Sequence, residues 1–440
     1  MMLKPGQLLV SGEGLVVEVV SLIGSGGQGE VYRVNVDGQG YALKWYHHPV
    51  TDGQVAVAVE QRRALTKYLL VNSPPDSRFL WPIGFVDEAE GRTYGYLMPL
   101  LADRFSGLES LVLGKMRPVP SFRVLCRAAI GLSECFRKLH NMGACYKDIN
   151  LGGPVIDPTN GDVMVCDLDN VRINKTPGNI LFVFFAAPEL IRGEGSCQTN
   201  TDIHSLAVLL FYMFIRQHPL DGMQQLKVNV FNEAAQRKFY GKQPVFIFDP
   251  DNDTNRPVPG FHDHAIRNWS IYPHFLQRLF TRSFTEGLHE PALRVREGEW
   301  MEAFSRLRDS LFYCSGCGSE NFYDFERNVE GQQQPCWRCG VSTPMPMRLE
   351  LGDRWILLNH NTALYGHHLG RRLDFSRALA QVSQHPQDER KWGLTNLSKE
   401  SWTYRARDGG LKECAPGRSV PLRSGLVVNF GRREGVIRLR

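Results

Sequence analysis

The feature that most constrains the fold is a glycine-rich loop between two apolar segments near the start of the chain. Residues 24–29 read Gly-Ser-Gly-Gly-Gln-Gly, and apolar strand patterns precede and follow them, the first at residues 16–23. In a strand–loop–strand unit, Gly24, Gly26 and Gly29 let backbone amides approach phosphates without a side-chain clash. A dinucleotide-binding fold would place a helix after the glycines, so this setting favours a nucleotide loop within a sheet.

A lysine on a further strand pattern is the next sign of nucleotide binding. Lys44 stands thirteen residues after Val31 and two after Ala42. Inside an apolar strand, such a lysine can hold the α and β phosphates of a nucleotide if a carboxylate holds the lysine in place. Glu60, in the helical pattern of residues 55–70, is the candidate carboxylate. The alternative is a surface lysine whose stem lies along apolar atoms.

Polar motifs follow a long helical pattern at residues 121–142. Residues 146–150 read Tyr-Lys-Asp-Ile-Asn, and residues 163–169 form an apolar strand pattern that ends in Asp-Leu-Asp. Ala-Pro-Glu follows at residues 187–189. In this order and spacing, the motifs resemble those of the eukaryotic-like Ser/Thr protein kinases, and the likeness covers about residues 10–311.

The resemblance implies a bilobal α+β protein-kinase fold, with an N-lobe of about residues 10–98 and a C-lobe of about residues 102–311. It implies that Asp148 is the catalytic base and that Asp167 binds Mg²⁺, with Lys44 and Glu60 as further catalytic residues. The residues expected to bind ATP and its metal are then Gly24, Gly26, Gly29, Val31, Ala42, Lys44, Met98, Leu100, Asn150 and Asp167.

Four positions depart from the kinase pattern. Asn150 stands where the family has a lysine, and Gly153 stands where it has the metal-binding asparagine. Lys147 replaces an arginine and Asp169 replaces a glycine. Asn150 turning toward the metal, or Asp169 adding a carboxylate, would compensate. We favour a kinase that depends on ATP and Mg²⁺ or Mn²⁺ and phosphorylates Ser/Thr on a partner protein or on itself. The alternative is a weak pseudokinase that serves as a nucleotide-binding scaffold.

Two CxxCG motifs lie close together after the kinase-like region, with 18 residues between them. Each motif places two thiolates on one tight turn, so the pair supplies four tetrahedral ligands for Zn²⁺. Disulfides or a redox pair are the alternatives. The unit, residues 312–345, resembles a zinc ribbon, and its acidic side chains outnumber its basic ones, so nucleic acid is not an expected partner. The expected zinc ligands are Cys314, Cys317, Cys336 and Cys339.

The last segment, residues 346–440, shows short apolar stretches separated by Gly, Asn and Pro, which predict a β-sandwich. Residues 376–382, 393–398 and 420–431 resemble parts of a forkhead-associated (FHA) domain, a family that binds phosphothreonine. From residue 351 to 440 there are 16 Lys/Arg and 8 Asp/Glu, a charge of +8, while the remainder carries 35 minus 38, or −3. This basic excess suits a phosphorylated protein partner.

The residues that would read phosphothreonine match the FHA pattern poorly. Ser376 is retained, but His367 stands where the family has an arginine, and Leu379 replaces its histidine. Arg377 and Lys399 are nearby cations, so phosphate binding stays one of the alternatives. The module is therefore expected to be either a phosphopeptide reader or a degenerate FHA-like interaction domain.

The expected location is the cytoplasm. The N-terminus has no secretion-signal pattern, and the longest apolar run, residues 206–215, is too short to span a bilayer. Six cysteines outside the CxxCG motifs are scattered mostly in apolar segments, as is common in reducing compartments. We expect a protein substrate and no membrane partner. The compact kinase-like region joined to a ribbon gives the chain a bacterial character.

Overall fold

The computed structural model describes residues 2–47, 53–87, 93–174, 183–327, 334–371, 374–406 and 409–439. The chain divides into two compact units. The first holds residues 1–119, 131–213 and 229–244, and the second holds residues 120–130, 214–228 and 245–440. The boundaries predicted after residues 311 and 345 do not appear as boundaries between these units.

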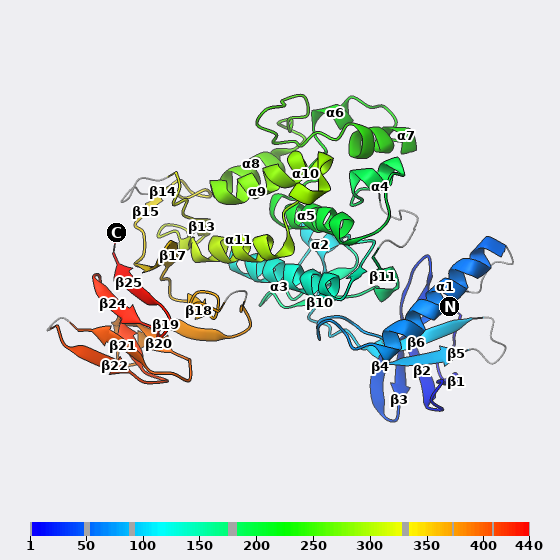
Figure 1. The fold of residues 1–440 in the computed structure, drawn as a ribbon, viewed down its shortest axis with the longest axis horizontal. Coiled ribbons are helices and arrows are strands. Elements are labelled where there is room, and N and C mark those ends of the chain that lie inside the picture. Colours follow the sequence, from blue (N-terminus) through cyan, green and yellow to red (C-terminus); the bar gives the residue numbers. More distant parts are fainter. Residues whose placement is uncertain are drawn as a thin grey trace. The chain divides into compact units, whose positions relative to one another are not determined.

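The first unit begins with a six-stranded antiparallel sheet in the order β1-β2-β3-β4-β6-β5 (Figure 1). Because successive side chains of a strand point to opposite faces, this sheet has two apolar faces. One face carries a cluster around Tyr32, Leu43 and Leu97, and the other carries Phe85 and three tyrosines. The strands are β1 (Leu8–Val10), β2 (Val16–Ser25), β3 (Gly29–Val36), β4 (Gln39–Tyr46), β5 (Gly84–Asp87) and β6 (Tyr94–Pro99).

Helix α1 (Gly53–Val71) follows β4 and covers the helical pattern that the sequence predicts at residues 55–70. It contacts β5 and the short 3-10 helix η1 (Leu168–Asn170). The segment that follows the predicted metal-binding aspartate therefore packs against α1.

Two long helices carry the polar motifs of the kinase pattern. The predicted helix at residues 121–142 is observed as α3 (Phe122–Asn141), and the apolar run lies in α5 (Thr199–Ile215), which is buried on nearly all sides. The other elements of this part are β7 (Ser106–Gly107), α2 (Leu108–Val112), β8 (Ala144–Cys145), β9 (Pro154–Ile156), β10 (Val163–Val165), β11 (Arg172–Ile173), α4 (Pro188–Arg192), α7 (Glu233–Gln236) and the π-helix η2 (Arg237–Lys242).

The second unit contains a helical part with an aromatic core. The Trp300 ring lies 4.9 Å from the tilted ring of Phe280 and stacks on the Phe304 ring at 5.8 Å. Its helices are α6 (Met223–Leu226), α8 (Asp263–Ile271), α9 (His274–Phe284), α10 (Glu286–His289), η3 (Pro291–Leu293) and α11 (Glu297–Asp309).

Short hairpins follow the helices of the second unit. β12 (Leu311–Tyr313) pairs with β13 (Glu320–Phe322), and β14 (Gln334–Pro335) pairs with β15 (Ser342–Thr343). Each hairpin carries one CxxCG motif near its turn. The pairing of short strands thus sets where the cysteines point.

Two sheets make up the C-terminal module. A six-stranded sheet has the order β17-β16-β25-β24-β21-β22, and a four-stranded sheet has the order β18-β19-β20-β23. Side chains of both sheets, such as Ile356, Val382 and Trp402, form one hydrophobic cluster, which is the two-layer arrangement of a β-sandwich. The likeness to FHA domains stays a prediction. The strands are β16 (Arg348–Leu351), β17 (Arg354–Leu357), β18 (Ala363–Tyr365), β19 (Ala378–His385), β20 (Asp388–Asn396), β21 (Trp402–Arg405), β22 (Leu411–Cys414), β23 (Ser419–Pro421), β24 (Leu426–Asn429) and β25 (Glu434–Arg438).

Within the described residues, no helix combines the length and the apolar character needed to cross a membrane.

Candidate active site

Lys44 lies in the interior of the first unit's sheet, on β4 between β3 and β6. The strand register places it opposite Val31 of β3 and Tyr96 of β6. Ala42 shares its face of the sheet, because side chains two apart on a strand point the same way, and Ala42 is paired with Met98. One face of the sheet therefore brings together four of the residues predicted to bind ATP.

The glycine-rich loop joins β2 to β3. Gly29 has no room for a side chain, since a Cβ there would lie 2.2 Å from the Trp45 carbonyl oxygen. The Gly26 amide donates a hydrogen bond of 2.9 Å to the Gly29 carbonyl, which closes the loop. Gly24 and Gly26 have space for a Cβ, so packing does not explain their glycines. A loop kept clear for a ligand would explain them. Leu100, predicted to contact adenine, is half-buried just after β6.

Lys44 is held by two carboxylates of the segment after β10. Its Nζ lies 2.5 Å from Oδ2 of Asp169 and 3.3 Å from Oδ1 of Asp167. Burial alone would lower the pKa of the lysine, but the attraction of Asp169 and then of Asp167 outweighs it, and the net result is a raised pKa. The surface-lysine alternative does not describe this structure, because Lys44 is only 8% exposed.

Asp169 is the more buried of the two carboxylates and has further partners on the sheet. The Tyr46 hydroxyl donates to its Oδ1 at 2.5 Å, and the Tyr96 hydroxyl donates to the same oxygen at 3.2 Å. Burial would raise the pKa of Asp169, yet the charge of Lys44 and the hydrogen bonds of Lys44 and Tyr46 keep it below its usual value. Asp169 is thus a buried anion with a cation and two hydroxyl donors.

Asp167 differs from Asp169 in its surroundings. Its side chain is 53% exposed, and its backbone has a φ of 52°, in the left-handed region. A non-glycine residue in this conformation is uncommon, and such residues cluster at functional sites. An exposed carboxylate next to a buried lysine is the arrangement that a metal–triphosphate ligand would require.

The structure does not bring Glu60 to Lys44. Glu60 lies on α1 with an exposed side chain. In the part of the chain that the structure describes, Lys44 makes its ion pairs with Asp167 and Asp169 and none with Glu60. This corrects the expected pairing, and the physical cause is Asp169, whose carboxylate occupies the place beside Lys44 where glycine would leave room.

Asp202 fixes the loop that carries the predicted catalytic base. Its carboxylate accepts hydrogen bonds from the backbone amides of Tyr146 and Lys147, the second at 3.1 Å, and lies 3.1 Å from Nε2 of His140. Lys147 has a φ of 65°, so the loop turns through the left-handed region next to Asp148. The buried carboxylate of Asp202, near the start of α5, therefore fixes the backbone from which the Asp148 side chain extends.

Asp148 has the acid–base property that a catalytic base needs. Its burial raises the pKa of the carboxyl to about 6, although hydrogen bonding from Asn150 and the charge of Lys147 oppose the rise. The nearby charge of Asp167 raises it further. A carboxylate with a pKa near neutrality can accept or orient the proton of an attacking hydroxyl at physiological pH.

The departures at Asn150 and Gly153 have a structural explanation. Both ends of the Asn150 amide are engaged by the loop itself, because Nδ2 donates to the Asp148 carbonyl at 2.9 Å and Oδ1 accepts from the Gly152 amide at 2.7 Å. At Gly153, a Cβ would lie 2.7 Å from the Tyr146 hydroxyl oxygen. A side chain at position 153 would therefore have to displace the Tyr146 hydroxyl.

The four cysteines of the two CxxCG motifs lie together. Their sulfur atoms are all within 4.8 Å of one another, and the pairs Cys314–Cys339 and Cys317–Cys336 are 3.5 and 3.7 Å apart. A tetrahedral zinc with Zn–S bonds of about 2.3 Å requires sulfur separations of about 3.8 Å. All four thiols are free, and no disulfide joins them. The donor set fits zinc.

Backbone groups of the two turns also favour thiolates. The Cys317 amide donates to the Cys314 sulfur and is the main reason that the pKa of this thiol is lowered to about 6. Gly318 and Gly340 follow their CxxC turns with φ of 70° and 75°, which a side chain would strain. The glycines of both motifs thus let the backbone amides turn toward the sulfurs.

A second group of potential ligands consists of Asp309, His367 and His368. His368 places Nε2 2.9 Å from Oδ2 of Asp309 and accepts from the Tyr365 amide through Nδ1. His367 contacts the Ser305 hydroxyl through Nε2 at 2.6 Å, and burial lowers its pKa to about 2. The ring nitrogens are already hydrogen-bonded, so the group is a buried polar network within the second unit. His367, at the position of the FHA arginine, is neutral and covered.

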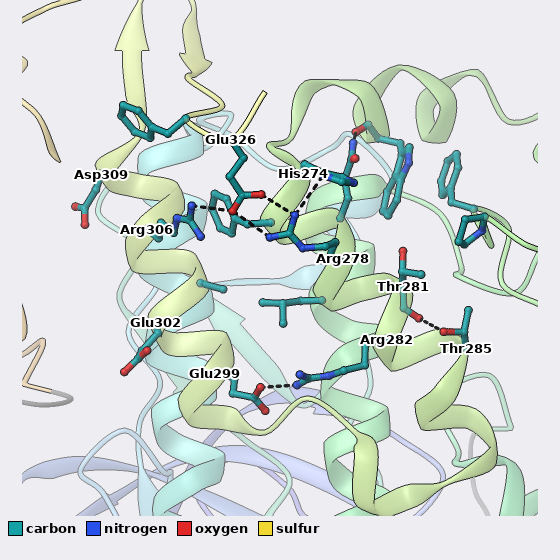
Figure 2. A pocket seen from close by; sticks show the side chains of 18 of the residues that line it. His274, Arg278, Thr281, Arg282, Thr285, Glu299, Glu302, Arg306, Asp309 and Glu326 are labelled. Atoms are coloured by element: carbon teal, nitrogen blue, oxygen red, sulfur yellow. Dashed lines mark hydrogen bonds and ion pairs between the residues drawn. The ribbon is translucent and has the colours of Figure 1, made fainter. Parts of the chain in front are cut away.

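A cavity of about 1260 Å³ lies in the second unit, beside α9 and α11. Figure 2 shows Glu326 between Arg278 and Arg306, and Arg282 against Glu299. The corresponding N–O distances are 2.6, 3.0 and 2.5 Å. These guanidinium groups are already neutralised by carboxylates, and the described lining includes none of the residues predicted to bind ATP or zinc. The cavity is therefore separate from the candidate active site.

Asp202 opens the apolar run that resembles the buried helix of kinase C-lobes, although its hydrogen bonds to the loop were not predicted. Two further residues that shape this site, Tyr46 and Tyr96, were not predicted from the sequence. Tyr46 stands two positions after Lys44, which places it on the same face of the strand. Tyr96 carried no such signal, because its role depends on the pairing of β4 with β6.

No family model matches the chain. It is similar to protein kinase MCK1 of Saccharomyces cerevisiae, with 29% identity over 92 residues, and to glycogen synthase kinase 1 of Pyricularia oryzae, with 28% identity over 96 residues. Each match covers 20% of this chain, and the chain spans about a quarter (24%) of each curated relative. Both relatives are named as kinases, which supports a kinase-like fold. Among solved structures, the autoinhibited serine kinase domain of titin matches 65% of this chain and 78% of its own, with a TM-score of 0.48 and 14% identity.

Proposed function

We propose that the kinase-like region is a protein kinase that transfers a phosphoryl group from ATP to Ser/Thr of a partner protein or of the chain itself. One observation carries this proposal. The buried Lys44 pairs with the exposed Asp167, 123 residues later, and the charge of Asp167 acts on Asp148, whose pKa is about 6. A cation, a metal-binding carboxylate and a base are the three charged parts that phosphoryl transfer requires.

Each residue has a defined task in this proposal. Lys44 would hold the α and β phosphates, and the exposed Asp167 would hold Mg²⁺ or Mn²⁺, which neutralises charge on the phosphates when bound. Asp148 would orient the acceptor hydroxyl and take its proton. The face formed by Val31, Ala42 and Met98 would receive the adenine ring.

The test is phosphoryl transfer by the purified full-length chain. It would be incubated with γ-labelled ATP and either Mg²⁺ or Mn²⁺, with a generic protein acceptor present. The proposal expects label on the chain or the acceptor, and its loss in Asp148→Asn, which keeps the shape of the side chain. Absence of label with both metals, or equal labelling by wild type and variant, would contradict the proposal.

A specific observation favours a second candidate, a nucleotide-binding scaffold without turnover. The position of the second metal ligand is Gly153, which the Tyr146 hydroxyl crowds, and the Asn150 amide is engaged by its own loop. The scaffold predicts that ATP raises the unfolding temperature and that Lys44→Ala removes this effect, while no label is transferred. The same labelling experiment therefore separates the two candidates.

We propose a structural zinc ion on the four cysteines. All four ligands are protein thiolates, so the site would be closed to substrate and would stabilise residues 312–345 rather than catalyse a reaction. The support is the fit of the sulfur separations to a tetrahedral site.

For the C-terminal module we propose protein binding. Ser376, Arg377 and Lys399 are exposed, which leaves them available to a phosphorylated partner. The Ser376 hydroxyl, however, already donates to Asp374 at 2.8 Å. If the full chain retains phosphothreonine peptides better than unphosphorylated ones, the result would support recognition of the phosphate group. Equal retention of the two kinds of peptide would contradict it.

A further inference from the structure

We propose that Asp169 is the positioning residue of Lys44, in place of a glutamate on α1. This inference rests on the proposed function, because it concerns the lysine that would bind the phosphates of ATP. It predicts that the lysine is anchored by the segment that follows the metal-binding aspartate, and that α1 makes no charged contact with it.

The described side chains of α1 that contact the sheet near Lys44 include two arginines. Arg62 lies over the Tyr46 ring at 5.0 Å, and Arg63 lies over the Tyr94 ring at 5.1 Å. Glu60 lies about 160° around the helix axis from Arg62 and about 60° from Arg63, and its side chain is exposed rather than directed at Lys44. The side of α1 that meets this part of the sheet therefore carries cations, which have the same sign as Lys44.

Asp169 supplies the missing negative charge. Its Oδ2 is 2.5 Å from the lysine Nζ, closer than the 3.3 Å of Asp167. The short helix η1 that contains it contacts α1, and Arg62 also stabilises the Asp169 carboxylate electrostatically. Asp169 thus pairs with Lys44 of the sheet, and the charge of Arg62 on the helix also favours its ionised form.

The sheet holds Asp169 in one orientation. Tyr46 and Tyr96 both donate to Oδ1, which leaves Oδ2 directed at Lys44. A buried charge is retained only where a partner and hydrogen bonds compensate its lost hydration. Four groups therefore form one unit, in which two tyrosines orient the aspartate and the aspartate orients the lysine.

Asp169 is poorly suited to the alternative role of a second metal ligand. Its side chain is 5% exposed, and both oxygens have partners within the protein. Asp167, with a side chain 53% exposed, is accessible to a metal. The two aspartates of the Asp-Leu-Asp motif thus have separate tasks: Asp167 faces the ligand and Asp169 faces the lysine.

The test measures ATP affinity by calorimetry on the full-length chain, with and without Mg²⁺, so that binding is observed independently of phosphoryl transfer. Asp169→Asn keeps the shape of the side chain and removes its charge. Because this variant loses a charged hydrogen bond, we expect it to bind ATP more weakly, by a factor on the order of ten to a hundred. Lys44→Met should cause a similar loss, and the double variant should bind no more weakly than either single variant, because the two residues act as one unit.

Glu60→Gln is the matched control, since it removes one carboxylate charge at the site where kinases place the anchor, and it should leave the affinity unchanged. Tyr46→Phe should weaken binding in the same direction but by less than Asp169→Asn. The reactivity of the Lys44 amine toward an acylating reagent, followed by mass spectrometry over a range of pH, should shift to lower pH in Asp169→Asn and not in Glu60→Gln. A general loss of packing would not produce this selective shift.

The inference would be overturned by wild-type affinity in Asp169→Asn, by a loss in Glu60→Gln as large as that in Asp169→Asn, or by additive losses in the double variant. A loss confined to Mg²⁺-containing buffer would also overturn it, since that result assigns Asp169 to the metal. If the expected losses of ATP affinity and the non-additive double variant are found while no phosphoryl group is transferred, the inference stands and only the proposed function fails.

Discussion

Tyr146 and Gly153 compete for one space in the catalytic loop: a Cβ at position 153 would lie 2.7 Å from the Tyr146 hydroxyl oxygen. That hydroxyl donates to the carbonyl of Cys166, the residue before the predicted metal-binding aspartate. Tyr146 therefore links the loop that carries the predicted base to the segment that carries the predicted metal ligand. A side chain at position 153, where the kinase pattern has asparagine, would crowd this hydroxyl.

Restoring asparagine alone should damage the protein. Gly153→Asn forces a side chain against Tyr146, and overpacking of this kind costs about 1–3 kcal/mol. We expect a lower unfolding temperature and no gain in metal-dependent activity. Adding Tyr146→His, which removes the hydroxyl and shortens the side chain, should recover stability in part. Calorimetric unfolding of the three variants checks both expectations.

Gly40→Ala is a suitable control for this series, because a Cβ at position 40 meets no atom within 4 Å. It should unfold at nearly the wild-type temperature. If Gly153→Asn were as stable as Gly40→Ala, the crowding by Tyr146 would not be the reason for the glycine.

Asp148 should give phosphoryl transfer an acidic limb in its pH dependence. Its pKa is about 6, and only the ionised form can accept a proton. The rate should therefore rise as the pH passes through about 6 and level off above 7. Initial rates between pH 5 and 8 at saturating ATP test this. A rate that is flat across pH 6, with the chain still folded, would contradict the assignment of Asp148 as base.

The same shift predicts an effect on stability. The pKa of Asp148 in the folded state lies above the usual aspartate value of 3.8, so between these two values the folded state binds more protons than the unfolded state. The contribution of Asp148 to the free energy of unfolding therefore falls as the pH rises from about 4 to about 6. Asp148→Asn should be more stable than wild type at pH 7.5, and the difference should shrink toward pH 4. Thermal unfolding at the two pH values measures it.

The sequence was most informative where function depends on local spacing. The clustering of Cys314, Cys317, Cys336 and Cys339, predicted from two short motifs, is confirmed by their geometry, while the zinc itself stays a prediction. The strand carrying Lys44 was predicted for the same reason, because the glycine loop and the lysine are close in sequence.

The sequence was least informative where a contact joins distant segments. Residues 56–59 of α1 read Ala-Val-Ala-Val, so their hydrophobicity does not show which side of the helix faces inward. The sequence therefore did not indicate whether the Glu60 side chain points toward Lys44 or toward solvent. The Lys44–Asp169 pair depends on packing between β4 and η1, which no local pattern encodes. The loss of a family glycine at position 169 was visible, but its partner was not.

The four-cysteine cluster should require metal for its fold. Removing zinc with a strong chelator, or changing Cys336→Ser, should release the two hairpins, since structural zinc sites supply about 10–16 kcal/mol of binding free energy in small domains. We expect one zinc per chain by elemental analysis and none in the variant. Hydrogen exchange should rise in residues 312–327 and 334–345. Cys414→Ser, a buried thiol outside the cluster, should keep the zinc.

Asp202 should be essential for holding the catalytic loop. Asp202→Ala leaves the buried amide of Tyr146 and the partly buried amide of Lys147 without their acceptor, and each unpaired group costs about 1–3 kcal/mol. A destabilisation of about 2–6 kcal/mol is therefore expected, together with loss of phosphoryl transfer. Asp202→Asn retains one acceptor oxygen, so it should lose less stability than Asp202→Ala. Because Asp202 orients the loop and lies apart from the nucleotide face, ATP affinity of the folded Asp202→Asn variant should stay near that of wild type while its turnover falls. Calorimetry for binding and labelled ATP for turnover separate these effects, and an equal loss in both would show that Asp202 acts through general packing.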